Sequence, residues 1–121
     1  MNRSAIAATL MLALFGAPAL AQDTHPLVVE GKEAYDFLCS KCHGQAMVNP
    51  GTSSYDLRKW PINDRVGFEN SVLNGKDAMP AWADILEDGE LEALWAYVVT
   101  RGGAEPLPAD LGDANAPRVG N

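Results

Sequence analysis

Two cysteines and a histidine lie close together in the segment Cys39-Ser40-Lys41-Cys42-His43. Two thiols at this spacing near a helix end can add to the two vinyl groups of one porphyrin, and the next imidazole can then bind the iron. The C-x-x-C-H pattern therefore predicts that Cys39 and Cys42 attach one haem covalently and that His43 is an axial ligand. The second ring nitrogen of a metal-binding histidine needs an acceptor, and the carbonyl of Pro50 is the candidate in the following loop.

Three other chemistries compete for these cysteines. A thioredoxin-like redox pair requires a strand–helix pattern around it, which the sequence lacks, and gives His43 no role. A zinc site requires further Cys or His ligands, and His25 lies far upstream. A plain Cys39–Cys42 disulfide stays open, because an exported chain meets oxidising conditions. In that alternative the protein is a haem-free exported binding module.

A second iron ligand is expected from a methionine. Outside residues 1–21 the methionines are Met47 and Met79. Met47 is four residues from His43, a span of about 14 Å when extended, which is too short to pass around a haem to its opposite face. Pro80 fixes a backbone angle beside Met79 and steadies that loop. We therefore predict Met79 as the second axial ligand, with a gap-filling core methionine as the alternative.

The elements that position these residues are helices joined by long loops. Apolar spacing and capping residues predict three helices. They are expected over 31–41, from an Asn63 or Asp64 cap to Asn74-Gly75, and from Glu87 or Asp88 to Gly102-Gly103. The polar stretch 44–64 is expected to be a loop. Trp95 belongs to the apolar stripe of the last helix and is expected in the core. No segment favours a strand, so the predicted fold class is all-α.

The 121-residue chain divides into three parts. Residues 1–21 have a basic start, an apolar stretch too short to span a bilayer, and small residues at the end, which is typical of a signal peptide cleaved after Ala21. Residues 22–103 form the predicted domain, with a short lead over 22–30. Residues 104–121 are expected to be a mobile, acidic, proline-rich tail. The predicted location is the periplasm, with no stable membrane insertion after cleavage.

The composition excludes several classes of protein. A hydrophobic fraction of 47% is too high for a disordered chain, and the length allows one modest core. A net charge of −7 repels phosphate backbones, so we expect no nucleic-acid partner. So small a core needs another source of stability, which a covalently held haem would supply.

The segment 31–103 resembles the class I c-type cytochromes, which are small monohaem proteins. Besides the cysteine motif and Met79-Pro80, the matching residues are Gly31, Tyr35, Leu94 and Tyr97. The resemblance implies the cytochrome c fold, with three to five short helices and long loops wrapped around one covalent haem c. It also implies that Gly31 and Tyr35 pack on Leu94 and Tyr97.

The segments 49–51, 56–58 and 75–82 are similar to those of small periplasmic cytochromes that accompany quinoprotein (PQQ-dependent) alcohol dehydrogenases. Since the protein fills both axial positions, the expected function is a monomeric one-electron shuttle and not an enzyme. The expected donor is a quinoprotein alcohol dehydrogenase, and the expected acceptor is the oxidase-ending respiratory chain. The alternative is a haem enzyme or gas-binding sensor in which Met79 is a labile ligand.

Further side chains are expected around a bound haem. The Trp60 indole N–H and the Arg58 guanidinium are candidate donors to a haem propionate, because a buried carboxylate needs such donors. Trp82, close to Met79 in sequence, is a further candidate contact. Lys41 and Lys76 flank the two ligand segments, so they are candidates for a docking spot beside the haem edge.

Overall fold

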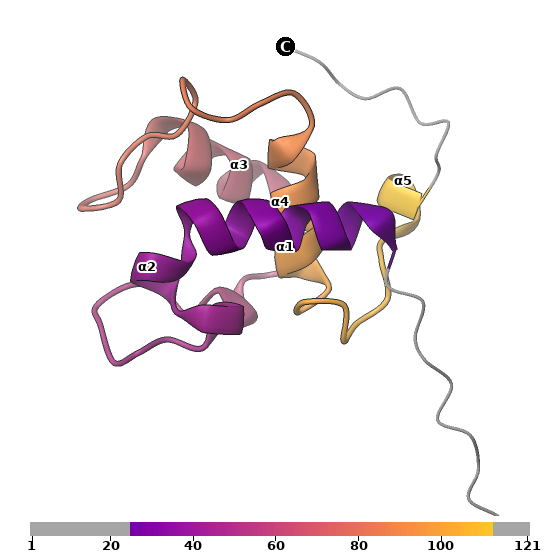
Figure 1. Ribbon diagram of the computed structural model, residues 1–121, viewed down its shortest axis with the longest axis horizontal. Coiled ribbons are helices and arrows are strands. Elements are labelled where there is room, and N and C mark those ends of the chain that lie inside the picture. Colours follow the sequence, from indigo (N-terminus) through magenta and orange to yellow (C-terminus); the bar gives the residue numbers. More distant parts are fainter. Residues whose placement is uncertain (1–24, 113–121) are drawn as a thin grey trace, which may run out of the picture.

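The computed structural model describes residues 25–112, and within that range the chain is helical and contains no strand (Figure 1). The helices are α1 (Pro26–Leu38), α2 (Ser40–His43), α3 (Arg65–Asn74), α4 (Glu90–Val99) and α5 (Ala109–Gly112). Two 3-10 turns, η1 (Gln45–Met47) and η2 (Leu57–Lys59), interrupt the long loop between α2 and α3. The all-α prediction is confirmed. The predicted signal peptide, 1–21, lies outside the described residues.

Helix α1 begins at Pro26 and not at Gly31 as predicted. Proline suits the first turn of a helix because its fixed backbone angle is helical and its missing N–H would have no partner there. The His25 side chain caps the helix by accepting a hydrogen bond from the Leu27 N–H at 3.2 Å. Val28 then packs into the core. Residues 26–30, predicted as part of an irregular lead, are therefore helical.

Helices α1 and α4 make the main contact of the fold, and Figure 1 shows α1 crossing α4. Gly31 lies at the closest approach, because a Cβ placed there would be 1.8 Å from the carbonyl oxygen of Ala93 and 2.9 Å from Cβ of Tyr97. One turn later, the rings of Tyr35 and Tyr97 lie 5.1 Å apart between centroids. The contact of Gly31 and Tyr35 with Tyr97, which the family resemblance implies, is present.

Replacement of Gly31 by alanine tests this contact. In an exposed helix the change stabilises by about 1 kcal/mol. Here the added methyl overlaps the Ala93 backbone, and we expect a loss of about 3 kcal/mol in the free energy of unfolding. Urea unfolding of the haem-loaded protein measures it. Glu33→Ala, on the exposed side of α1, is the control and should change stability by less than about 0.5 kcal/mol. A Gly31→Ala protein as stable as the wild type would contradict the close crossing.

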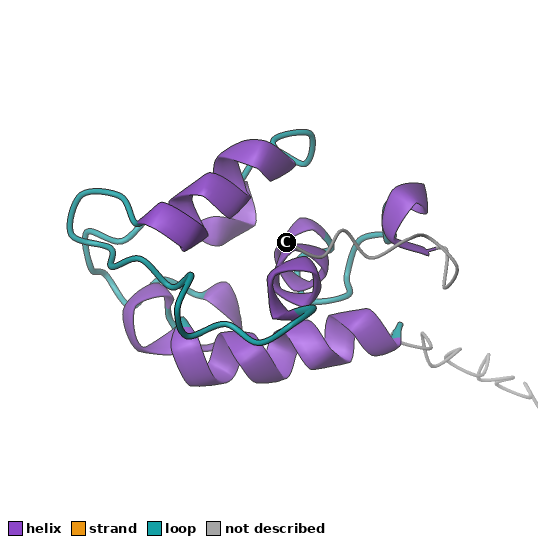
Figure 2. Cartoon of the chain, turned by 90° about the horizontal axis from the view of Figure 1, so that it is seen from above, coloured by secondary structure: helices purple, strands orange, loops and turns teal. Residues whose placement is uncertain are grey.

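Helix α3 follows the sequence prediction closely, whereas α4 begins at Glu90 after Gly89, not at Glu87 or Asp88, and ends at Val99. Asp64 caps α3 by accepting a hydrogen bond from the Gly67 N–H at 3.0 Å, and Gly75 ends it with a φ of 76°. Trp95 of α4 is 2% exposed and packs on Phe68 of α3 with ring centroids 5.3 Å apart. The prediction of Trp95 as a core residue is confirmed. Figure 2 shows α3 and α1 as separate layers with loops between them at one end of the molecule.

Part of the expected tail, residues 104–112, packs against the folded core. Leu111 is 5% exposed, and Leu107 packs against the same core. A guanidinium nitrogen of Arg65 lies 3.9 Å from a carboxylate oxygen of Asp110 in α5. Burial of two leucines thus holds a segment whose prolines exclude a long helix. The rest of the predicted tail, 113–121, lies outside the described residues.

Candidate haem site

A largely apolar cavity of about 750 Å³ opens between α1, α3, α4 and the loops that join them. Its lining includes six residues named from the sequence: Cys39, Cys42, His43, Trp60, Met79 and Trp82. These residues come from three separate segments of the chain, which are 39–43, Trp60 and 79–82. The cavity lies within the usual size range of protein sites for small molecules and cofactors, about 300–1,000 Å³.

The end of α1 and the short helix α2 place the C-x-x-C-H motif in the cavity wall. Cys39 is the C-cap of α1, where its N–H donates to the Tyr35 carbonyl at 2.8 Å, and it is also the N-cap of α2. Gly44 ends α2 with a φ of 88°, and the Tyr35 hydroxyl donates to its carbonyl at 2.7 Å. This buried bond braces the backbone directly after His43.

Both thiols are free, so no disulfide joins Cys39 and Cys42. Cys42 is exposed and Cys39 is half-buried. Burial raises the pKa of the Cys39 thiol to about 12, and the neighbouring Cys42 adds to the shift. The Cys39 sulfur is therefore neutral at physiological pH, when it carries no substituent.

The Nδ1 atom of His43 lies 2.9 Å from the carbonyl oxygen of Tyr55, and this corrects the prediction that Pro50 supplies the acceptor. A carbonyl only accepts, so Nδ1 carries the hydrogen and Nε2 keeps the lone pair that binds a metal. Pro50 is not among the cavity-lining residues. The side chain of Asn49 explains the difference, because its oxygen accepts hydrogen bonds from the Gly51 and Thr52 N–H groups in a tight turn. The turn directs the backbone away from His43 at Pro50, and the backbone comes back to the imidazole at Tyr55.

Met79 lies in a tight turn, and it is one of the residues that line the cavity. The Lys76 and Met79 backbones exchange two hydrogen bonds, of 3.1 and 2.9 Å. Gly75 precedes the turn, and a Cβ there would be 2.6 Å from the Met79 carbonyl oxygen. Met47, in contrast, is 1% exposed within the core and does not line the cavity. The structure therefore places the two methionines as the sequence analysis distinguished them, with Met79 and not Met47 beside the cavity.

Of the other residues expected to contact a haem, the two tryptophans line the cavity and the arginine does not. Trp60 and Trp82 line the cavity, but the Trp60 indole N–H donates to the Asp64 carbonyl at 2.9 Å and is already used. Arg58 is not among the lining residues, because its guanidinium makes two 2.9 Å hydrogen bonds to the carboxylate of Asp56. The structure thus gives both donors local partners and does not place Arg58 in the cavity wall, and the role of Trp60 toward a propionate stays a prediction.

The residues present fit a haem. The cavity is apolar and offers two thiols, one imidazole with a fixed tautomer and one thioether, which are the attachment and ligand groups of a haem c. A zinc site does not fit, because residues 25–112 contain no group of three or more Cys, His, Asp or Glu side chains that could hold a metal ion. The arrangement brings the attachment and ligand groups for one iron porphyrin to a single cavity.

The chain is similar to known haem proteins. The family model described as cytochrome C oxidase, cbb3-type, subunit III matches residues 26–98. Cytochrome c6 of Gloeothece citriformis is 30% identical over 109 residues, which cover 84% of this chain and 96% of that protein. Cytochrome c6 of a Nostoc species is 32% identical over 75% of this chain and 82% of its own length.

One larger protein is similar to this chain over a small part of its own length. The quinohemoprotein alcohol dehydrogenase ADH-IIG of Pseudomonas putida is 33% identical over 69% of this chain, which corresponds to 12% of that protein. No solved structure matches the chain. Among the described residues, no helix has the length and apolar character needed to cross a membrane.

Proposed function

Because this chain belongs to the c-type cytochromes, whose members bind one covalent haem c with its iron, we propose that Cys39 and Cys42 form the two thioether bonds and that His43 and Met79 are the axial ligands. The protein is an electron carrier and not an enzyme, in line with its cytochrome c6 relatives. The observation that supports this assignment most is that all four side chains line one cavity.

The protein contributes fixed ligand positions. The Tyr55 carbonyl orients His43, and the Lys76–Met79 turn holds Met79. When bound, haem supplies a one-electron Fe(III)/Fe(II) couple. Ligands held in this way need little movement when the iron changes charge, which favours fast electron transfer. A gas-binding sensor would instead need Met79 to leave, so carbon monoxide binding by the wild-type protein would count against the proposed axial pair.

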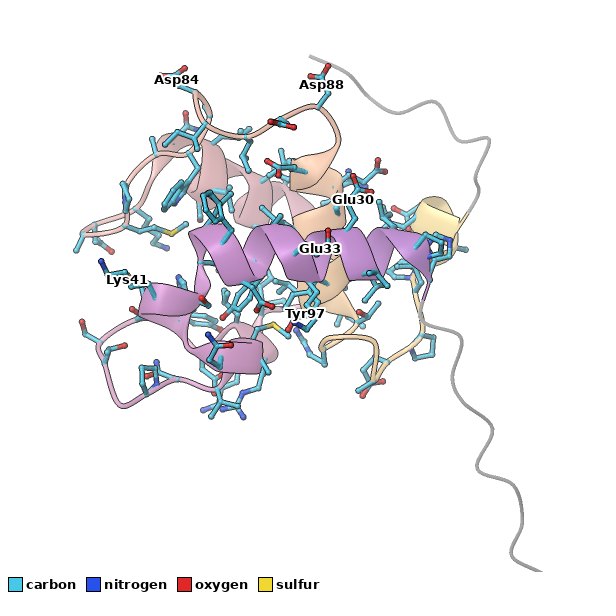
Figure 3. The ribbon with its side chains drawn as sticks, in the orientation of Figure 1. Glu30, Glu33, Lys41, Asp84, Asp88 and Tyr97 are labelled. Carbon is cyan, nitrogen blue, oxygen red and sulfur yellow. The ribbon has the colours of Figure 1, made fainter. Side chains whose placement is uncertain are left out.

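The proposed electron donor is a quinoprotein alcohol dehydrogenase, and the proposed acceptor is an oxidase-ending respiratory chain in the periplasm. The similarity to the quinohemoprotein alcohol dehydrogenase supports the choice of donor. Lys76 lines the cavity rim, and Lys41 is exposed on α2 (Figure 3), whereas the labelled carboxylates of Glu30, Glu33 and Asp84 lie elsewhere. Lys76 in the cavity lining and Lys41 between the two cysteines are cations on an acidic protein, and they are suited to steering a partner.

Stopped-flow reduction of the oxidised protein tests the donor. The purified dehydrogenase with its alcohol should reduce the protein, and the rate should depend on ionic strength. The double variant Lys41→Glu with Lys76→Glu should be reduced more slowly, with a changed salt dependence. Asp84→Asn, at an exposed site outside the cavity lining, is the control. If a small reductant such as ascorbate reduces the protein while the dehydrogenase does not, the donor is wrong and the carrier function stands.

A further inference from the structure

Arg101 directly follows the last turn of α4 in an unusual backbone conformation. Its φ is 54°, in the left-handed region that favours glycine at a helix end. The next two residues, Gly102 and Gly103, adopt positive φ angles without this strain. An arginine persists in such a conformation when its surroundings hold it there, so its side-chain contacts are the place to look for a role.

The Arg101 guanidinium joins α4 to a segment more than forty residues earlier in the chain. Its Nη2 atom donates to the Trp60 carbonyl at 2.6 Å, and its Nη1 atom donates to the carbonyls of Leu57 at 3.2 Å and Val98 at 3.1 Å. Among the described residues no carboxylate forms an ion pair with Arg101. The planar guanidinium spreads its donors over separate nitrogens, whereas a lysine has a single nitrogen.

The segment that Arg101 holds is one wall of the cavity. Leu57 and Trp60 both line the cavity, as does Val98 on α4. The ring of Tyr55 packs edge-on against Trp60, with centroids 5.4 Å apart, and the Tyr55 carbonyl is the acceptor for Nδ1 of His43. A shift of this wall would therefore move both an aromatic side chain of the cavity and the group that orients the histidine.

We propose that Arg101 is a positioning residue of the haem site. Its guanidinium fastens residues 57–60 to the end of α4 and thereby fixes Trp60 and the Tyr55 carbonyl. The strained backbone of Arg101 is retained because a glycine there could not make these contacts. This inference rests on the proposed placement of the haem, but the fastening of the wall is measurable without any redox partner.

Three variants of the haem-loaded protein test the proposal. Arg101→Gly removes the guanidinium and relieves the backbone strain, and Arg101→Lys keeps the charge on one nitrogen. Arg58→Gln is the control, because Arg58 lies in the same segment and its side chain pairs with Asp56 only. The measurements are hydrogen exchange at the Trp60 amide and indole N–H groups and the haem reduction potential.

We expect exchange at Trp60 to become about tenfold faster in both Arg101 variants, since each loses hydrogen bonds to the wall. The reduction potential should fall in both, because a looser wall admits water, which stabilises the more charged oxidised iron. Arg58→Gln should match the wild type in both measurements.

Several results would overturn the proposal. Unchanged exchange in Arg101→Gly would make Arg101 a simple helix-terminal residue, and wild-type behaviour of Arg101→Lys would assign the effect to charge alone. Faster exchange with an unchanged potential, or equal effects in Arg58→Gln, would remove the link to the haem site. If the proposed haem assignment itself is wrong, the wild-type protein will lack covalent haem, and this is measured independently of the Arg101 variants.

Discussion

A chain with both Cys39→Ala and Cys42→Ala carries no covalent haem and loses its fold. The apolar walls of the cavity of about 750 Å³ between α1, α3 and α4 would then be exposed to water. Each Å² of apolar surface exposed in this way costs about 25 cal/mol, and the core loses the group around which it packs. Small domains have about 5–15 kcal/mol of total stability. The intact mass should lack the haem, and far-ultraviolet circular dichroism should show loss of helix.

The control for this experiment is Lys41→Ala. Lys41 lies between the two cysteines and is exposed, so its replacement should leave haem content and helicity unchanged. The cysteine variant must be made in the same host, with the same export and cytochrome-maturation machinery. If that variant kept covalent haem, or melted cooperatively at the wild-type temperature without it, the haem would not be the centre of this core.

Met79→Ala opens one coordination position on the iron. Met79 lines the cavity, and the other methionine of the described chain, Met47, is buried in the core away from it. A thioether ligand favours ferrous iron and raises the reduction potential, so its loss should lower the potential. We expect a decrease on the order of 0.1 V or more, since axial ligands set haem potentials over a range of about 0.8 V. Spectropotentiometry measures the potential, and carbon monoxide should now bind.

The matched control is Met47→Ala. Met47 is 1% exposed, so its truncation should cost about 2–5 kcal/mol of stability. The absorption spectrum and the potential should stay at wild-type values, and carbon monoxide should not bind. Loss of the low-spin spectrum in Met47→Ala, or a wild-type spectrum in Met79→Ala, would show that the proposed ligand is wrong.

The features that could be predicted from the sequence depend on neighbouring residues. Asp64 and Gly75 mark both ends of α3, and the apolar stripe containing Trp95 marks the buried face of α4. Gly31 and Tyr35 were placed against α4 through the family resemblance, and the contact is present. Met47 and Met79 could be distinguished because the four residues from His43 to Met47 are too few to pass around a haem.

The features that could not be predicted depend on side-chain bonds whose partners the sequence does not specify. A histidine is an uncommon helix cap, so the start of α1 at Pro26 was missed. The turn built by the Asn49 side chain moved the acceptor of His43 from Pro50 to Tyr55. The Asn49-Pro50-Gly51 sequence is itself a turn signal, and it could have indicated that the chain returns to His43 several residues later.

Long-range contacts account for the remaining differences. The Trp60 indole N–H donates to the Asp64 carbonyl, and the Arg101 guanidinium donates to the carbonyl of Trp60. Neither contact leaves a periodic signal in the sequence. The ordered segment 104–112 was missed because Leu107 and Leu111 are isolated apolar residues among prolines and acidic residues, and only the folded core gives them a place to pack.

The most direct test of the account is the alkaline pyridine haemochrome spectrum of the protein purified from a host that exports and matures cytochromes. Denaturation in pyridine replaces the axial ligands and leaves the porphyrin substituents to set the absorption. We predict the spectrum of a haem whose two vinyl groups are both saturated by thioethers, at one haem per chain. A spectrum with free vinyl groups, or colourless protein, would contradict covalent attachment through Cys39 and Cys42.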